Sequence, residues 1–411
     1  MVPLEHTALR LDNGLRVVIV PRVGSPLATV WVRYGVGAGD DPPEHRGLAH
    51  LVEHLLFTGS RHTYGSDTSD HLYQARALGA NGATAAATTD YYQSVPRVNL
   101  ERVLWLESDR MGYMRGEVTR AEVELARQVV DTELKIIKND PQARMFGRVH
   151  NAVFPAPHPF HDPEDASTLA RVDVATVEGF LARYVVPANA ILIVVGDLPN
   201  DIEGLVRRYF AGLPGGTAPV RPAVPASPLT TGALMREAAE AAMIKIGWPS
   251  PVQRTRGDAA ADLAAVLLER NLGGRLWAED GAIATLEAQQ VSKAGSSLFV
   301  VQAVGRPGSL AREVLRAVEA AVANLAGVSA EEVAAARAVM RVEAMDRRGS
   351  TMALAETIAA HMTAYGKADA LADELQRYHS TGVEDVVALA RDALMTARRA
   401  ALLADAEGGR A

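Results

Sequence analysis

The residues best placed to do chemistry are His50, Glu53 and His54, which lie within the apolar stretch 47–57. No residue in this stretch interrupts a helix, so we expect it to be helical. Residues four apart share one face of a helix, so the two imidazoles aim at a common point and Glu53 lies beside it. Two neutral imidazoles suit a divalent ion such as zinc, and a carboxylate that is not a ligand can take a proton from water held by the metal.

The order His-x-x-Glu-His is the reverse of the commoner His-Glu-x-x-His and is known as the inverzincin motif. The alternative is that the three polar residues are unrelated. The apolar flanks weigh against that alternative, because an apolar helix rarely buries His, Glu and His without partners. The chain contains no cysteine, so any metal site must use His, Asp or Glu side chains.

The elements around this helix are predicted from hydrophobic periodicity and turn residues. Strands are expected at 7–11, 15–20, 28–34, 83–95 and 190–195, with Gly79 to Gly82 as a turn before the fourth. Helices are expected at 69–78, 100–114, 120–138, 143–153, 172–184 and 201–210. The glycine run 35–39 lacks the GxGxxG spacing of a nucleotide-binding loop, so nucleotide binding is disfavoured.

A third metal ligand is needed, because a catalytic zinc usually has three protein ligands and an open position. The helix expected at 120–138 carries a candidate, Glu133. Glu133 adjoins an apolar stripe that we expect to be buried, formed by Val129, Val130, Leu134 and Ile137. This pattern alone leaves open whether Glu133 binds a metal or is a solvated glutamate.

The second half of the chain repeats the order of the first half. Residues 214–228 contain five prolines and two glycines, which predicts an extended linker. Strands then follow near 234 and at 243–248, 285–290 and 297–304, with a helix at 258–272 and further helices to the end. We therefore predict an α+β fold of two similar domains, each with a mainly antiparallel sheet packed by helices. The predicted divisions are 1–213, a linker at 214–230, and 231–411.

Composition disfavours several classes of protein. The 411 residues can build two or three cores, and a net charge of -7 without a basic run argues against nucleic-acid binding. The longest apolar runs are too short to cross a bilayer, so no membrane span is expected. Residues 1–6 lack a basic segment followed by an apolar run, so we expect no signal peptide and a cytoplasmic protein.

The motif His50-x-x-Glu53-His54, with Glu133 about eighty residues later in a Val-Val-x-x-Glu setting, resembles the pitrilysin/insulinase (M16) metallopeptidases. Residues 104–111, 158–160 and 184–197 are also similar to that family. The resemblance is strong over residues 8 to 213 and weaker afterwards. It implies Zn2+ held by His50, His54 and Glu133, with Glu53 as the general base of peptide hydrolysis.

The same resemblance implies two similar α+β domains that form half of a clam-shell chamber, which would favour small or unfolded peptides. It also implies a substrate-binding edge strand of small residues that pairs with the peptide by β-augmentation. The residues expected on that edge are Ala83, Thr84, Ala85 and Ala86.

Two departures from the family pattern bear on function. Many members carry a second glutamate seven residues before the zinc glutamate, where this chain has Ala126. Family members also carry an assisting arginine and tyrosine after a Gly-Gly opening, and the stretch 273–285 keeps the opening but shows neither at the expected points. The chain thus resembles the metal-bearing subunit of a two-chain enzyme. We expect a dimer in which a related chain supplies the missing Arg and Tyr.

Two other functions remain open. One is a non-catalytic scaffold or assembly subunit that kept the fold. The intact His50, Glu53, His54 and Glu133 argue against it, while Ala126 argues mildly for it. The other is a zinc hydrolase that acts on a non-peptide substrate.

Overall fold

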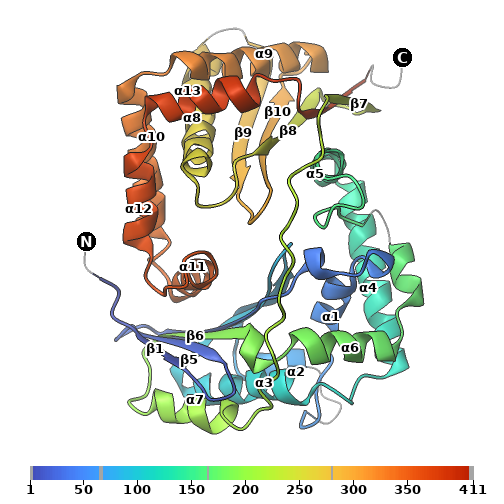
Figure 1. Ribbon diagram of the computed structural model, residues 1–411, viewed down its shortest axis with the longest axis vertical. Helices are drawn as coiled ribbons and strands as arrows, with labels where there is room; N and C mark the ends of the chain where they lie inside the picture. The colour runs from blue at the N-terminus through green and yellow to red at the C-terminus, as the bar shows by residue number, and fades with distance from the viewer. Residues whose placement is uncertain (1–2, 64–67, 164–165, 279–280, 407–411) are drawn as a thin grey trace. The chain divides into compact units, whose positions relative to one another are not determined.

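The computed structural model describes residues 3–63, 68–163, 166–278 and 281–406, without the side chains of 271–278. The chain forms two compact units (Figure 1). The first comprises the described residues of 1–136, 163–221 and 345–370, and the second those of 137–162, 222–344 and 371–406. Within the described residues, none of the helices combines the length and apolar character that crossing a bilayer requires.

The first unit contains six strands among its described residues. They are β1 (Thr7–Arg10), β2 (Arg16–Pro21), β3 (Leu27–Tyr34), β4 (Leu78–Thr84), β5 (Thr89–Pro96) and β6 (Ala190–Gly196). Its α-helices are α1 (Leu48–Leu55), α2 (Thr68–Gln74), α3 (Leu100–Tyr113), most of α4 (Arg120–Asn139), α6 (Val174–Tyr184), α7 (Ile202–Phe210) and α11 (Thr351–Ala364).

The second unit contains five strands among its described residues. They are β7 (Ala233–Ala238), β8 (Met243–Ser250), β9 (Ile283–Val291), β10 (Ser297–Gly305) and β11 (Ala400–Asp405). Its α-helices are α5 (Pro141–Val153), α8 (Arg256–Ala278), α9 (Ala311–Asn324), most of α10 (Ala330–Asp346), α12 (Leu371–Ser380) and α13 (Val383–Leu389).

The two sheets share one topology. The described strands lie in the order β1-β2-β6-β3-β5-β4 in the first sheet and β7-β11-β8-β10-β9 in the second. The pairs β2–β6 and β7–β11 are parallel, and the other pairs are antiparallel. The series β2-β6-β3-β5-β4 therefore matches the whole second sheet in chain order and direction. This confirms the predicted α+β class with two similar, mainly antiparallel halves.

The central strands of the first sheet are buried on both faces. Val17 and Ile19 of β2 join the large core formed with α1, α3, α6 and α7. The alternate residues Val18 and Val20 point to the opposite face, because successive side chains of a strand alternate. There they pack with residues of α11 that include Leu354 and Ile358. The core on the α1 side holds the helix that carries His50 and His54.

Two helices belong to a different unit from the one expected from their place in the sequence. The domain boundaries predicted from the sequence placed α5 in the domain of residues 1–213 and α11 in the domain of residues 231–411. In the structure α5 packs on β8 and β11, whereas α11 packs on β3 and β6. Hydrophobic periodicity shows that a helix has an apolar face, but it does not show which sheet covers that face.

Two strands differ from the sequence prediction. Residues 78–84 form β4 although Gly79 to Gly82 were expected as a turn, and the turn instead lies at 85–88, before β5. Only helices were expected after residue 304, yet Ala400–Asp405 form β11, between β7 and β8. The β11 sequence AALLAD has no β-branched residue. Its strand state therefore comes from pairing on both sides and not from propensity.

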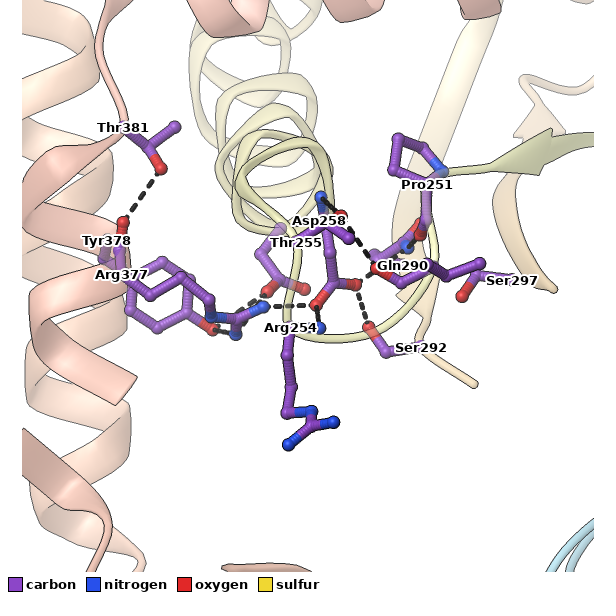
Figure 2. Close-up of polar contacts among 12 residues, drawn as sticks. Pro251, Arg254, Thr255, Asp258, Gln290, Ser292, Ser297, Arg377, Tyr378 and Thr381 are labelled. Atoms are coloured by element: carbon purple, nitrogen blue, oxygen red, sulfur yellow. Dashed lines mark hydrogen bonds and ion pairs between the residues drawn. The ribbon is translucent and has the colours of Figure 1, made fainter. Parts of the chain in front are cut away.

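The helix that follows the second of the matching strands, β3 in the first unit and β8 in the second, differs in chemistry between the units. In the first unit this helix is α1, and in the second it is α8, whose sequence contains no histidine. Asp258 and Asp262, four residues apart on α8, hold the guanidinium of Arg377, whose Nη2 lies 3.3 Å from Asp262 Oδ2. Gln290 and Ser292 donate hydrogen bonds to Asp258 (Figure 2). The guanidinium of Arg377 thus offsets one of the two negative charges on α8 within the same unit.

Candidate metal centre

The start of α1 is fixed by Asp41. The residue before the helix, Gly47, has a φ of 93°, a left-handed conformation that favours glycine and leaves no side chain to cap the helix. Asp41 takes over this role, because its Oδ2 accepts a hydrogen bond from the Gly47 amide at 2.7 Å and its Oδ1 accepts one from the Ala49 amide at 2.8 Å. Burial raises the pKa of Asp41 to about 7, and its hydrogen bonds with the helix amides oppose that rise.

Helix α1 divides its residues between the core and the site. Leu51 and Leu55 are fully buried against the sheet. The side chains of His50 and His54 are 30% and 23% exposed, on a face that solvent reaches. The apolar pattern of α1 therefore presents the two imidazoles outward from the core, as its helical spacing predicts.

The structure brings the three predicted ligands together. The Nε2 atoms of His50 and His54 lie 3.1 Å apart. Glu133 Oε2, from α4, lies 3.1 Å from the first and 3.2 Å from the second. Within the described residues, this is the one group of three or more His, Asp or Glu side chains whose ligand atoms all lie within 4.8 Å of one another.

This donor set fits a catalytic zinc ion. Two imidazole nitrogens and one carboxylate oxygen supply three protein ligands and leave a position for water or substrate. Burial lowers the pKa of His50, although Glu53 and Glu133 oppose this effect. A lowered pKa favours the neutral imidazole, which is the form that binds a metal.

The helix that supplies Glu133 differs in one respect from the prediction. Its buried face is formed by Val123, Ala126 and Val130, with Leu134 partly buried. Val129 and Ile137 were expected in the buried stripe, but they are 36% and 46% exposed. The centre of the stripe is thus rotated away from them, and Glu133 lies at its border with a side chain that is 41% exposed. A border position lets the carboxylate reach the histidines without being buried.

Ala126, at the position where many family members have a second glutamate, is 3% exposed and belongs to the apolar core. The side chain there packs against apolar neighbours, so position 126 itself offers no carboxylate.

Glu53 lies one residue before His54 and is 7% exposed. Its Oε2 accepts a hydrogen bond from Thr84 Oγ1 at 2.6 Å. Its backbone oxygen accepts a longer one, 3.4 Å, from the hydroxyl of Tyr91. The sequence indicated Thr84 only as part of a substrate strand, because a contact across thirty residues of chain leaves no periodic signal.

The residues expected to bind substrate are only partly on the edge strand. Among the described strands β4 is the last of its sheet, so Ala83 and Thr84 lie on an edge strand. Ala85 and Ala86 lie beyond its end, and their carbonyl oxygens accept hydrogen bonds from the amides of Ala38 and Gly39. The edge is therefore shifted to 78–84. The glycine run 35–39 packs its backbone on this turn, since a Cβ on Gly37 would lie 2.1 Å from the Ala85 oxygen.

The family pattern predicts an assisting arginine and tyrosine after the Gly-Gly opening, and the sequence of 273–285 has neither at the expected points. The side chains of 271–280 lie outside the described residues. Residues 283–285 belong to β9.

Comparison with known proteins gives a consistent family. Residues 16–159 match the model of "Insulinase (Peptidase family M16)", and residues 171–340 match that of "Peptidase M16 inactive domain". An uncharacterized zinc protease of Mycobacterium leprae is 28% identical over 96% of this chain and 90% of its own length. Subunit 1 of the mitochondrial cytochrome b-c1 complex of Bos taurus is 26% identical over 51% of this chain and 44% of its own.

A solved structure has the same fold. The crystal structure of a protease from Helicobacter pylori matches with a TM-score of 0.85 and 21% identity, over 98% of this chain and all of that chain. Together the two family models cover most of the chain, and the predicted resemblance is confirmed. The chain belongs to peptidase family M16.

Proposed function

We propose that this protein is a zinc-dependent endopeptidase that hydrolyses small or unfolded peptides. The observation that carries the proposal is the convergence of His50, His54 and Glu133 on one point, with Glu53 on the same helix as the histidines. The relatives that are named zinc proteases support the same reaction class.

The roles of the chain's own residues follow from their positions. His50, His54 and Glu133 hold the ion, which when bound supplies Lewis acidity at the scissile carbonyl and acidifies water. Glu53 takes the proton of the attacking water and later delivers it to the leaving amine. The edge of β4, the last of the described strands in its sheet, pairs with the extended peptide beside these groups, so that the backbone of the substrate is held by main-chain hydrogen bonds.

The proposal includes a second chain of the same family. After the opening that includes Arg275, the stretch 273–285 shows no arginine or tyrosine at the expected later points, so we propose that a related chain supplies them in a dimer. The arginine and tyrosine of that chain would stabilise the negative charge that develops on the oxygen of the substrate carbonyl.

The alternative function is a non-catalytic scaffold or assembly subunit. It is favoured by two observations. Ala126 replaces a family glutamate, and a subunit of the bovine cytochrome b-c1 complex is similar over half of the chain. The metal ligands and Glu53 are retained here, which is why we place catalysis first.

The experiment measures zinc content and cleavage of a peptide library by the purified chain, alone and with a related family chain. The variant Glu53→Gln serves as the control. We expect about one zinc per chain in both proteins and cleavage by the wild type, with a loss of about 10²- to 10⁴-fold in Glu53→Gln.

The outcomes separate the possibilities. Cleavage by the chain alone would support the peptidase and exclude an obligate partner, whereas cleavage only with the related chain would support the two-chain enzyme. Zinc binding without cleavage in either case would favour the scaffold. A chain that binds no zinc would refute the metal site itself.

A further inference from the structure

Strand β4 contacts Glu53 through the side chain of Thr84. The hydroxyl Oγ1 of Thr84 lies 2.6 Å from Glu53 Oε2, a distance typical of a strong hydrogen bond to a carboxylate. Thr84 is the last residue of β4 and Glu53 is near the end of α1, so the contact joins the edge strand to the metal helix.

The direction of this hydrogen bond follows from the neighbours of Thr84. Its Oγ1 lies also 3.4 Å from Thr89 Oγ1, its cross-strand partner on β5. Thr89, however, donates its own proton to the Val36 carbonyl at 2.9 Å. A hydroxyl has one proton, and an ionised carboxylate only accepts hydrogen bonds. The Thr84 proton therefore goes to Glu53 Oε2.

The other oxygen of Glu53 lies against a glycine of the same strand face. A Cβ on Gly82 would lie 2.8 Å from Glu53 Oε1, 3.0 Å from its Cγ and 3.0 Å from Phe57 Cε2. Gly82 and Thr84 are two residues apart and therefore point to the same face of β4. Gly82 leaves room for the Glu53 carboxylate, and Thr84 donates a hydrogen bond to it.

The two carboxylate oxygens are thus in different environments. Oε2 is held by Thr84, whereas among the described residues no group donates a hydrogen bond to Oε1. A fixed Oε2 restricts rotation of the carboxyl group and leaves Oε1 to accept a proton. Glu53 is 7% exposed, so few water molecules compete for this contact.

We infer that Thr84 is a positioning residue, which orients Glu53 as a proton acceptor and ties that orientation to the substrate-edge strand β4. This inference deepens the proposed function and rests on it for the role of Glu53. It also assigns Thr84 a task different from the one expected from sequence, where it was grouped with the strand residues that contact the peptide.

The experiment compares Thr84→Val, which keeps the shape and removes the hydroxyl, with Thr84→Ser, which keeps the hydroxyl. Thr88→Val, in the turn after β4, is the matched control. Zinc content, kcat and KM for a peptide cleaved by the wild type are measured, with the related chain added if activity requires it. Crystal structures of the metal-free variants give the position of the Glu53 carboxylate.

We expect zinc content to be unchanged in all three variants. Thr84→Val should lower kcat by about 10- to 100-fold with little change in KM, because a misplaced catalytic group costs rate. Its Glu53 carboxylate should leave the position beside Gly82. Thr84→Ser should restore kcat and carboxylate position, and Thr88→Val should resemble the wild type.

The inference is overturned if Thr84→Val keeps the wild-type kcat, or if its Glu53 carboxylate does not move. It is also overturned if Thr84→Ser is as slow as Thr84→Val. Should Thr84→Val fail to fold, Thr84→Ala takes its place under the same criteria. If the wild type cleaves no peptide under any condition, the proposed function fails, and the crystal structures still decide whether Thr84 holds Glu53.

Discussion

Nε2 of His50 and Nε2 of His54 lie 3.1 Å apart, so one turn of α1 presents both imidazole nitrogens to the same point. The oxygen of Glu133 that completes the group comes from α4, 79 residues after His54. These three atoms meet only in the folded chain, so a cation held by them would bind the folded state and not the unfolded one.

Zinc is therefore expected to stabilise the folded chain. At a free zinc concentration about one hundred times the dissociation constant, the gain in unfolding free energy should be about 2.7 kcal/mol. Thermal unfolding with zinc and after EDTA treatment measures it. His54→Ala is the control and should show no zinc-dependent shift, and a wild type indifferent to EDTA would contradict the site.

Removing the third ligand should weaken metal binding strongly. Replacing a residue that only hydrogen-bonds to a metal ligand already lowers metal affinity by about 10- to 100-fold. Glu133→Gln, which changes a ligand itself, should lower the zinc affinity by more than that. Competition with a chromogenic chelator measures the affinity. Asp131→Asn is the matched control, because Asp131 lies on the same helix and pairs with exposed Lys135. Equal affinities for the two variants would show that Glu133 is not a ligand.

Asp41 should affect both stability and metal affinity through the start of α1. Asp41→Ala leaves the amides of Gly47 and Ala49 without their acceptor, which should cost about 1–3 kcal/mol of unfolding free energy. A less fixed helix should also bind zinc more weakly. Asp41→Asn keeps one acceptor oxygen. Its free energy of unfolding, measured with urea, and its zinc affinity, measured by titration, should lie between those of Asp41→Ala and the wild type. An Asp41→Ala protein as stable as the wild type would argue against this capping role.

Asp262 should make stability depend on pH. Burial, together with the neighbouring charge of Asp258, raises the pKa of Asp262 from 3.8 to about 7. Between these pH values the folded chain keeps a proton that the unfolded chain loses, so the stability contributed by this group falls as pH rises from about 4 to 7. The slope approaches about 1.4 kcal/mol per pH unit.

The variant Asp262→Asn removes this titration. Between pH 4 and 7, the free energy of unfolding measured with urea should fall less steeply for this variant than for the wild type. At pH 8 the variant should have the larger free energy of unfolding. Asp392→Asn, at an exposed position, is the control and should keep the wild-type slope. An Asp262→Asn slope equal to that of the wild type would contradict the raised pKa.

The sequence by itself determined the elements that local patterns encode. The spacing of His50 and His54 fixes their common face once the stretch is helical, because that geometry is a property of the helix alone. The class of fold and the similarity of the two halves were also predictable, since β-branched runs and amphipathic helices repeat in the same order. The candidate Glu133 followed from a local pattern together with the family resemblance.

Tertiary structure alone decided which distant residues meet. The contact of Thr84 with Glu53, the place of α5 and α11 on different sheets from those expected, and the strand state of β11 all depend on packing between segments far apart in the chain. Periodicity describes the faces of one element, but it carries no information on the element that covers them. The sequence placed Glu133 beside an apolar stripe, but only the fold shows where that stripe is centred and that the carboxylate reaches the histidines.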